Sequence, residues 1–476
     1  MVLFYCTSAN CQFDNNRWLV GYSPTVQVIF NDSSMIDSVY YIKQPYRFTD
    51  GHSNISKAGS IPLSCNGYFL FNGKGELIEN GDSLVPNKLL IDDNGSSTYV
   101  DQSLIIPKNK DNYYVFVSAM SNKQYDNCVN GGTCKFDILT YSIVDMNENG
   151  RSGKVVLKEK HIIEDDSMRS ALSACKHANG RDWWVVVPHY FRHAYYKLLV
   201  TPDTILGPYF QDLGAPSIPF HRLMQTNFSL DGTMYTYTQN NEPDIVVDKF
   251  DRCTGLFTSY KVLNPPKDIS GQYAGIGNCF SPNGNFLYLC SPKNIYQYDI
   301  ENEEFIQLMV DSLNVKDNQA AAYGEDGKIY IGNFHKTDGR MSYIRFPNKK
   351  GLACELCVLC YTANNVNLSN PPNMPNYALG ALKGSPCDTL GKLQNQTMVV
   401  YPNPASNYLQ VYFPQAMNSN VELALYDMLG QRVYSWNKTL NSKQEVVLSL
   451  PKLSVGLYTL QAEVNGDKYV AKVLIE

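Results

Sequence analysis

Between about residues 60 and 350 the chain repeats one pattern of hydrophobic and polar positions. A short apolar stretch leads to an Asn-Gly or Asp-Gly turn, and a strand of aromatic and aliphatic residues follows. The clearest copies have turns that start at Asn179, Asp231, Asn283 and Asp326, at intervals of 52, 52 and 43 residues. Because these dipeptides readily adopt the positive φ that two-residue hairpins need, each copy predicts a hairpin.

Further short strands follow each hairpin, for example Ile295–Ile300 and Phe305–Met309. Three or four strands in about 40–50 residues are typical of one blade of a β-propeller. Neighbouring blades cover faces that a single small sheet leaves open, which explains the repetition. We therefore predict an all-β propeller of about seven blades over residues 13–390, with six or eight blades as alternatives. A set of β-sandwich domains is a further alternative, but sandwiches do not repeat one motif at near-constant spacing.

The C-terminal part of the chain has a different pattern. Residues 391–397 are polar and predict a linker. Shorter alternating strands then predict a small Ig-like β-sandwich over residues 398–476. The expected strands are Tyr408–Phe413, Val421–Tyr426, Gln431–Trp436, Glu445–Leu450, Gly456–Val464 and Tyr469–Ile475.

Composition supports a β-rich protein and excludes two classes. The 476 residues include 34 Tyr, and the net charge of −5 argues against a nucleic-acid binder, which would normally carry a basic surplus. No run of 18 apolar residues occurs, so we expect no membrane-spanning helix. Residues 1–12 are apolar and then small or polar, which predicts the remnant of a secretory signal peptide, with an ordinary first strand as the alternative.

The thirteen cysteines are more than a reducing compartment would favour. Cys128 and Cys134 flank a tight loop and predict a local disulfide, although spacing alone does not fix pairing. Cys354, Cys357 and Cys360 resemble part of an iron–sulfur or zinc site, but no fourth ligand follows at a short distance. We therefore expect disulfides or free thiols there, and no metal or cofactor.

A second place where a metal could bind is the segment from His189 to His193. These two histidines would share a face on a helix, but they lie between two predicted strands, so a loop is expected. We predict that His189, Tyr190, Arg192 and His193 form an exposed contact loop, since such side chains make adaptable contacts.

Four segments of the C-terminal domain form an ordered set of motifs: Tyr401–Pro404, Leu425–Val433, Ser454–Tyr458 and Lys472–Ile475. In these segments the domain resembles the type IX secretion (Por) C-terminal sorting domain of the Bacteroidetes lineage. The motif positions carried over are Pro402, Asn403, Pro404, Asp427, Gly430, Gly456 and Lys472. In that family the domain is a secretion address recognised at the outer membrane. Pro402 and Pro404 would mark the start of the domain, and Asp427 to Gly430 would form a turn.

The body contains a second set of characteristic segments: Asn16–Gly21, Val144–Met146, Phe250–Gly255, Phe280–Gly284, Pro375–Gly380 and Gly384–Leu390. In these segments it resembles the secreted propeller region that often precedes such sorting domains in that lineage. This resemblance implies a fold and a route of export, and it carries no catalytic residues. The stretch from Phe30 to Ser60 departs from the pattern, so the first blade is the least defined.

Asp-Ser or Asp-Thr followed by an aliphatic residue or Met occurs six times. These triplets resemble the O-glycosylation signal of the same lineage, although such pairs also favour turns. The candidate acceptors are Ser38, Ser83, Ser167, Thr204, Ser312 and Thr389.

These patterns favour a secreted or cell-surface protein, exported through the periplasm by the type IX machinery at the outer membrane. We expect its propeller to be a non-enzymatic binding or adhesion platform for an extracellular glycan or protein. The alternative is a secreted hydrolase or lyase acting on polysaccharide or peptide. Its candidate carboxylates are Asp182, Asp244, Glu325 and Asp326, which would have to converge at one mouth of the propeller.

Overall fold

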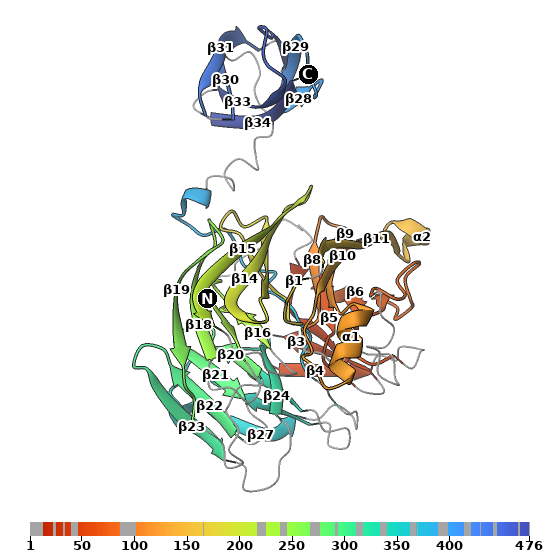
Figure 1. The fold of residues 1–476 in the computed structure, drawn as a ribbon, viewed down its shortest axis with the longest axis vertical. Coiled ribbons are helices and arrows are strands. Elements are labelled where there is room, and N and C mark those ends of the chain that lie inside the picture. The colour runs from red at the N-terminus through yellow and green to blue at the C-terminus, as the bar shows by residue number, and fades with distance from the viewer. Residues whose placement is uncertain are drawn as a thin grey trace, which may run out of the picture. The chain divides into compact units, whose positions relative to one another are not determined.

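The computed structural model consists almost entirely of β-strands (Figure 1). It describes residues 13–21, 25–31, 34–39, 46–85, 101–164, 166–216, 225–238, 245–266, 277–290, 294–310, 318–333, 340–361, 368, 370–388, 398–413, 420–428, 430–440, 445–464 and 467–475. The predicted signal-peptide remnant lies outside these residues. The chain divides into two compact units, one formed by residues 1–177 and 181–380, the other by residues 381–476 with 178–180.

The described part of the first unit contains seven antiparallel sheets. The first sheet is β2 (Arg17–Val20), β3 (Val26–Asn31) and β4 (Ser34–Val39), and the second is β1 (Phe13–Asp14), β5 (Ser53–Lys57), β6 (Ser60–Cys65) and β7 (Leu70–Asn72). The third is β8 (Ser103–Pro107), β9 (Asn112–Ala119), β10 (Ile138–Asp145) and β11 (Lys154–Ile163), and the fourth is β12 (Ser173–Lys176), β13 (Trp183–Pro188), β14 (Arg192–Val200) and β15 (Ile205–Pro216).

Three further sheets complete this unit. The fifth is β16 (Thr226–Phe228), β17 (Met234–Tyr237), β18 (Ile245–Asp251) and β19 (Leu256–Leu263). The sixth is β20 (Gly277–Phe280), β21 (Phe286–Cys290), β22 (Asn294–Asp299) and β23 (Glu304–Val310). The seventh is β24 (Asn318–Tyr323), β25 (Ile329–Asn333), β26 (Met341–Ile344) and β27 (Leu356–Tyr361).

Apolar clusters join each sheet to the next and close the ring. Trp18 and Phe30 of the first sheet share a buried cluster with Tyr330 and Met341 of the seventh. The Trp18 ring centre lies 4.6 Å from that of Phe30 and 5.8 Å from that of Tyr330. Clusters between successive sheets include Leu19 with Phe71; Ile55, Ile105 and Val185; Val186 with Tyr235; Val247 with Leu287; and Ile295 with Ile331. The body is therefore a closed propeller, as the repeat predicts.

The four predicted Asn-Gly and Asp-Gly turns connect the first two strands of the fourth to seventh sheets, but their loops are longer than expected. Ser229 N donates to Met234 O at 2.9 Å, so four residues lie in the loop instead of two. Gly232 N donates back to Ser229 O, and Gly232 has φ +73°, a conformation that glycine adopts without strain. Sequence correctly places these turns, while the two-residue geometry is wrong.

Two short helices interrupt the third sheet. Helix α1 (Asn122–Val129) begins after Ser121, whose Oγ accepts a hydrogen bond from Gln124 N, and the Cys128–Cys134 disulfide closes the loop that follows. Helix α2 (Glu148–Arg151) lies between β10 and β11. The turns η2 (Gly351–Cys354) and η3 (Pro386–Asp388) are 3-10 helices.

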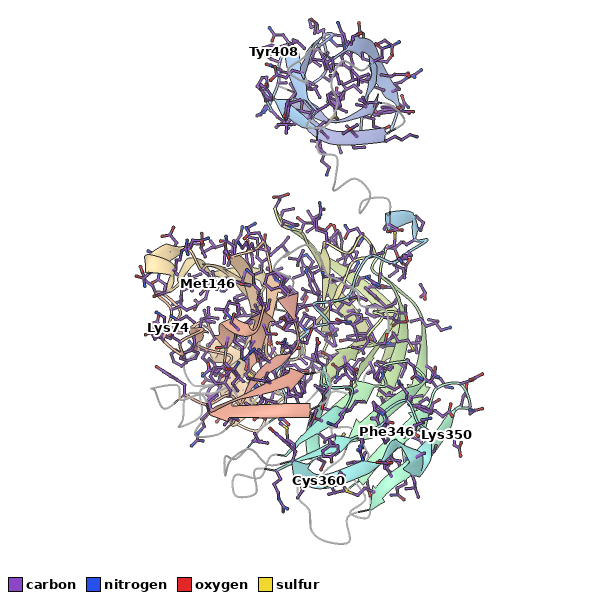
Figure 2. All side chains as sticks on the ribbon, turned by 180° about the vertical axis from the view of Figure 1, so that it is seen from behind. Lys74, Met146, Phe346, Lys350, Cys360 and Tyr408 are labelled. Atoms are coloured by element: carbon purple, nitrogen blue, oxygen red, sulfur yellow. A yellow bond between two sulfur atoms is a disulfide. The ribbon has the colours of Figure 1, made fainter. Side chains whose placement is uncertain are left out.

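Near the end of the seventh sheet, Cys357 and Cys360 of β27 form a disulfide, while Cys354 is a buried free thiol. Cys360, labelled in Figure 2, is exposed. The cysteines of this CxxCxxC segment are thus divided between a disulfide and a thiol.

The C-terminal unit contains two antiparallel sheets. One is β28 (Val399–Tyr401), β29 (Tyr408–Tyr412) and β32 (Glu445–Ser449), and the other is β31 (Arg432–Thr439), β30 (Asn420–Tyr426), β33 (Gly456–Val464) and β34 (Asp467–Ile475). Residues of both sheets share one buried core that includes Leu409, Leu448, Leu423 and Leu460. β28 precedes Pro402, so the prolines end the first strand of the domain instead of marking its start.

No helix in the described part of the chain has the length and apolar character needed to cross a membrane.

Candidate functional site

Residues 370–380, here named the axial strap, lie against the first strands of several sheets of the propeller. Asn373 Nδ2 donates to the carbonyl oxygens of Ser103 at 3.0 Å and Leu172 at 2.7 Å. Tyr377 is buried, and its hydroxyl donates to Ile105 O at 2.8 Å. These bonds attach the axial strap to β8, the first strand of the third sheet. They also attach it to Leu172, which directly precedes β12, the first strand of the fourth sheet.

The N-terminal end of the described chain holds the other side of the axial strap. Asn15 Nδ2 donates to Pro375 O at 2.8 Å, although the two residues are 360 positions apart. Asn15 Oδ1 accepts from Tyr377 N at 3.2 Å, and Asn376 Nδ2 donates to Leu230 O at 2.9 Å. The axial strap, which lies near the C-terminal end of the propeller sequence, therefore binds both the N-terminal residue Asn15 and the inner strands.

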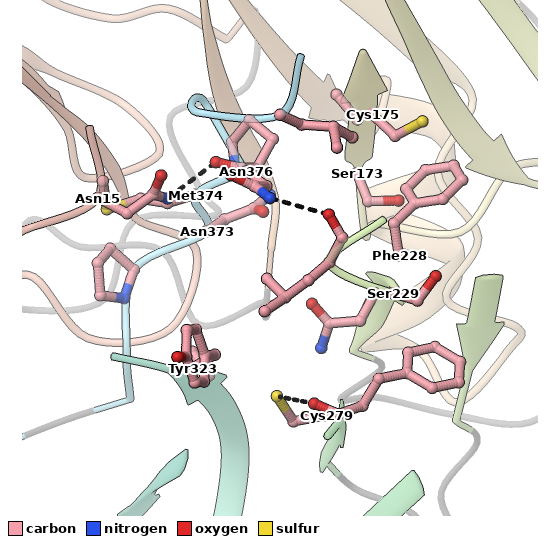
Figure 3. A pocket seen from close by; sticks show the side chains of 18 of the residues that line it. Asn15, Ser173, Cys175, Phe228, Ser229, Cys279, Tyr323, Asn373, Met374 and Asn376 are labelled. Carbon is pink, nitrogen blue, oxygen red and sulfur yellow. Dashed lines mark hydrogen bonds between the residues drawn. The ribbon is translucent and has the colours of Figure 1, made fainter. Parts of the chain in front are cut away.

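A cavity of about 260 Å³ lies between the axial strap and the first strands of the fourth to seventh sheets (Figure 3). Amide, hydroxyl, thiol and apolar side chains form its walls. The lining residues include Asn15, Trp18, Ser173, Cys175, Asn227, Phe228, Ser229, Cys279, Tyr323, Glu325, Asn373, Met374 and Asn376. Phe228, Tyr323, Met374 and Asn376 are half-buried, so the cavity has solvent-accessible walls.

This cavity, here named the axial pocket, offers little electrostatic or nucleophilic chemistry. Glu325 is the one charged side chain among its described lining residues, and its Oε1 accepts from Asn15 N at 3.1 Å. Burial raises the pKa of the Cys175 and Cys279 thiols to about 12, so both remain protonated at neutral pH. The pocket is suited to hydrogen bonding and apolar contact with a small neutral ligand.

Of the other carboxylates considered from sequence, Asp182 and Asp326 do not line the pocket with Glu325. Asp182 forms an ion pair with Arg181 in the β12–β13 turn, with Nε and Oδ1 at 2.6 Å. Asp326 pairs with Lys328 at 2.6 Å and accepts from the Tyr330 hydroxyl at 2.8 Å. Asp244 lies outside the described residues. Asp182 and Asp326 therefore stabilise the turns in which they lie.

Two titratable groups are buried near the starts of the inner strands. Asp101 Oδ2 accepts from Thr226 N at 3.4 Å, and burial raises the pKa of this carboxyl to about 8. Burial lowers the pKa of the His52 imidazole to about 3. Both side chains are therefore neutral in the folded propeller near pH 7.

The prediction of an exposed contact loop at residues 189–193 is wrong for three of its four residues. His189, Tyr190 and His193 are 8%, 3% and 3% exposed, and only Arg192 reaches solvent, where it pairs with Asp212. The sequence pattern placed a loop here, but β14 already begins at Arg192.

Contacts with the neighbouring sheet explain this burial. His193 Nε2 lies 3.0 Å from Asp248 Oδ1, and the Tyr195 hydroxyl donates to Asp248 Oδ2 at 2.5 Å. The Arg169 guanidinium donates to the backbone oxygens of His189 and Tyr190, each at 3.3 Å. These polar groups join the fourth and fifth sheets and have a structural role.

The sorting-motif residues of the C-terminal unit meet at one end of its larger sheet. Asn403 Nδ2 donates to Lys472 O at 2.9 Å, and Asn403 Oδ1 accepts from Leu474 N at 2.8 Å. Gly456 pairs with Ile475 between β33 and β34. Pro402 and Pro404 flank Asn403.

The turn between β30 and β31 belongs to the same group. Asp427 Oδ1 accepts from Gln431 N at 2.9 Å, and Gly430 has φ +76°. The Asn403 side chain thus joins motif segments that are distant in sequence, while Asp427 stabilises its own turn.

The candidate glycosylation residues differ in accessibility. Thr204 is exposed in the β14–β15 turn, while Ser83 and Ser167 are half-buried. Ser167 Oγ also accepts from Lys135 Nζ at 3.0 Å. Ser38 belongs to β4, but its side chain lies outside the described structure, as do Ser312 and Thr389.

Solved structures similar to this chain include a protein from Lactobacillus plantarum, with 10% identity, a TM-score of 0.46, and coverage of 77% of this chain and 98% of that one. Another is the periplasmic gluconolactonase of Pseudomonas aeruginosa, with 11% identity, a TM-score of 0.46, and coverage of 76% and 98%. Identity this low says nothing about activity. No curated protein matches the chain.

The family comparison concerns the C-terminal unit. Residues 399–476 match the family described as a secretion system C-terminal sorting domain. Sorting domains of this kind direct proteins through type IX secretion to the cell surface or the extracellular space. The chain therefore carries a type IX C-terminal sorting domain, which directs export to the cell surface or the extracellular space, behind a β-propeller.

Proposed function

We propose that the propeller is a non-enzymatic binding platform outside the cell, and that the axial pocket holds one residue of a neutral glycan. The observation that supports this most directly is the pocket wall, in which amides and hydroxyls alternate with Phe228, Tyr323 and Met374. Sugar hydroxyls pair well with amides, and the C–H faces of a sugar ring pack on aromatic rings. A volume of about 260 Å³ suits a single small residue better than an extended chain.

The rigidity of the site also favours binding. The axial strap is fixed to inner strands by the hydrogen bonds of Asn373 and Tyr377, and the strands themselves pack in a closed ring. A preorganised pocket loses little conformational entropy when it takes up a ligand. A glycoside hydrolase would need two carboxylates about 5–10 Å apart across the bound sugar. Glu325 has no such partner among the described lining residues of the pocket.

The test is a glycan-array screen of the purified full-length protein, followed by titration of the best ligand. We expect Tyr323→Ala and Asn376→Ala each to weaken binding about tenfold, which corresponds to about 1.4 kcal/mol. Tyr260→Ala is the matched control, because Tyr260 is 42% exposed on β19 and does not line the pocket. Release of cleaved sugar during incubation, or equal weakening by the control, would contradict the proposal.

We also propose that Thr204 carries an O-linked glycan when the protein is exported by its native machinery. Its exposed position in a turn leaves room for a bulky sugar. Intact-mass measurement of the secreted protein and of Thr204→Ala tests this: equal masses, apart from the substitution itself, would contradict it.

A further inference from the structure

The larger sheet of the sorting domain exposes apolar side chains where polar ones are expected. Inward-facing Leu425, Leu460 and Val473 are fully buried. The outward-facing Leu457 and Leu474 are each 40% exposed. An antiparallel sheet with one face in water normally carries polar residues there, so an exposed apolar group on that face calls for a partner.

These exposed side chains form one continuous group. Leu457 and Leu474 are directly paired between β33 and β34, and Thr459 pairs with Lys472 in the neighbouring position. Met428, which is 79% exposed, follows β30 in the turn on the same side. We name Met428, Leu457, Thr459, Lys472 and Leu474 the docking face.

The docking face is hollowed as well as apolar. A shallow depression of about 470 Å³ is lined by Tyr426, Asp427, Met428, Gly430, Leu457, Thr459 and Gln461. Exposed Lys472 stands beside this depression through its pairing with Thr459. The surface therefore fits a protruding apolar side chain with a carboxylate close by.

The sorting-motif positions hold this face in shape, and one of them, Lys472, belongs to it. Asp427 and Gly430 set the turn that carries Met428, and the Asn403 side chain fixes the backbone of Lys472 and Leu474. A motif that preserves the shape of an exposed apolar surface is expected when that surface is what a partner recognises.

We propose that a subunit of the type IX secretion machinery binds the sorting domain at the docking face, with an apolar side chain in the depression and a carboxylate at Lys472. The occupant follows from the identity of the domain, because the type IX machinery recognises such sorting domains. This proposal is independent of the ligand of the propeller.

The smaller sheet supplies a matched control. Tyr408, labelled in Figure 2, and Val447 are 46% and 55% exposed on that sheet, so they are as apolar and as accessible as the docking face. Neither residue is a sorting-motif position, and neither contacts the depression. If export needed only exposed apolar surface of any kind, Asp substitutions on either sheet would reduce export equally.

The experiment expresses the full chain in a host with a type IX system and measures its division between the periplasm and the exterior. We expect Met428→Asp with Leu457→Asp to reduce export at least about tenfold, as loss of an interface hot spot would. Tyr408→Asp with Val447→Asp should remain within about twofold of the parent, since it lies outside the interface.

Lys472→Glu guards against misfolding, because this side chain is exposed and the substitution reverses its charge without removing a buried group. We expect a severalfold loss of export with an unchanged unfolding temperature of the purified full-length protein. Normal export of both docking-face variants, or an equal loss in the Tyr408/Val447 control, would overturn the proposal.

Discussion

The propeller and the sorting domain use apolar side chains differently. In the propeller, large aromatic residues such as Trp18, Tyr195, Tyr288 and Tyr330 are almost completely buried, many of them between neighbouring sheets. Of the 23 large hydrophobic side chains exposed in the described residues, eleven lie in the sorting domain, which is about one sixth of the chain. Apolar surface in the propeller stabilises a rigid body, while the sorting domain keeps part of it available for recognition.

The two units also differ in how far apart their stabilising contacts lie in sequence. The propeller depends on Asn15 meeting the axial strap 360 residues later, whereas the larger sheet of the sorting domain pairs strands that lie close together in sequence. The propeller should therefore respond to changes at either end, and the sorting domain should unfold by itself.

The largest expected effect is on ring closure. Trp18→Ala removes a fully buried indole from the cluster between the first and seventh sheets, and we expect a loss of about 3–5 kcal/mol of propeller stability. Calorimetry of the full chain should show a lower propeller transition and an unchanged sorting-domain transition. Met428→Ala, at a side chain that is 79% exposed, should shift neither by more than about 0.5 kcal/mol. A common shift of both transitions under Trp18→Ala would mean that the units do not unfold separately.

A smaller effect is expected from the axial strap. Asn373→Ala leaves the backbone oxygens of Ser103 and Leu172 without their side-chain donor, at a cost of about 1–3 kcal/mol. Because Asn373 also lines the axial pocket, ligand affinity should fall together with the propeller transition temperature. Unchanged stability would show that the axial strap is not needed for ring closure.

The next effect is a pH dependence confined to the propeller. Asp101 has a pKa of about 8 when folded and about 3.8 when unfolded, so the folded state holds an extra proton between these values. The free energy of unfolding should therefore fall as pH rises, by at most about 2 kcal/mol from pH 6.5 to 8. His52 acts in the opposite direction in that range, by only about 0.4 kcal/mol, because its folded pKa of about 3 lowers stability as pH falls to and below its ordinary 6.5. Urea unfolding of Asp101→Asn should lack this slope, and a slope that persists would assign it to another group.

The smallest expected effect concerns the relative reactivity of the Cys128–Cys134 and Cys357–Cys360 disulfides. Cys357–Cys360 closes a very short loop and has an exposed sulfur-bearing residue, whereas Cys128 and Cys134 are 9% and 8% exposed. Mild reduction followed by alkylation and mass spectrometry should label Cys357 and Cys360 first, since access governs thiol exchange. Earlier labelling of Cys128 and Cys134 would contradict this order.

The sequence was informative where structure follows a local period. Turns at Asn179, Asp231, Asn283 and Asp326 were predictable because each hairpin is specified by neighbouring residues. The sorting domain was predictable from motif residues such as Asn403 and Asp427, which hold the backbone of adjacent strands.

The axial pocket was not predictable, because contacts between distant parts of the chain bring its residues together. Asn373 binds backbone oxygens of residues 201 to 272 positions away, and backbone acceptors leave no trace in side-chain patterns. His193 was misplaced because alternation does not reveal that Asp248 of another sheet covers it. In a closed ring, burial depends on partners in the next blade.

The most direct test of two separate units, one for binding and one for export, is deletion of residues 398–476 in a host with a type IX system. We expect the remaining chain to accumulate in the periplasm with the propeller transition of the full protein. Normal appearance outside the cell would contradict the export role, and loss of the propeller transition would contradict the separation of the units.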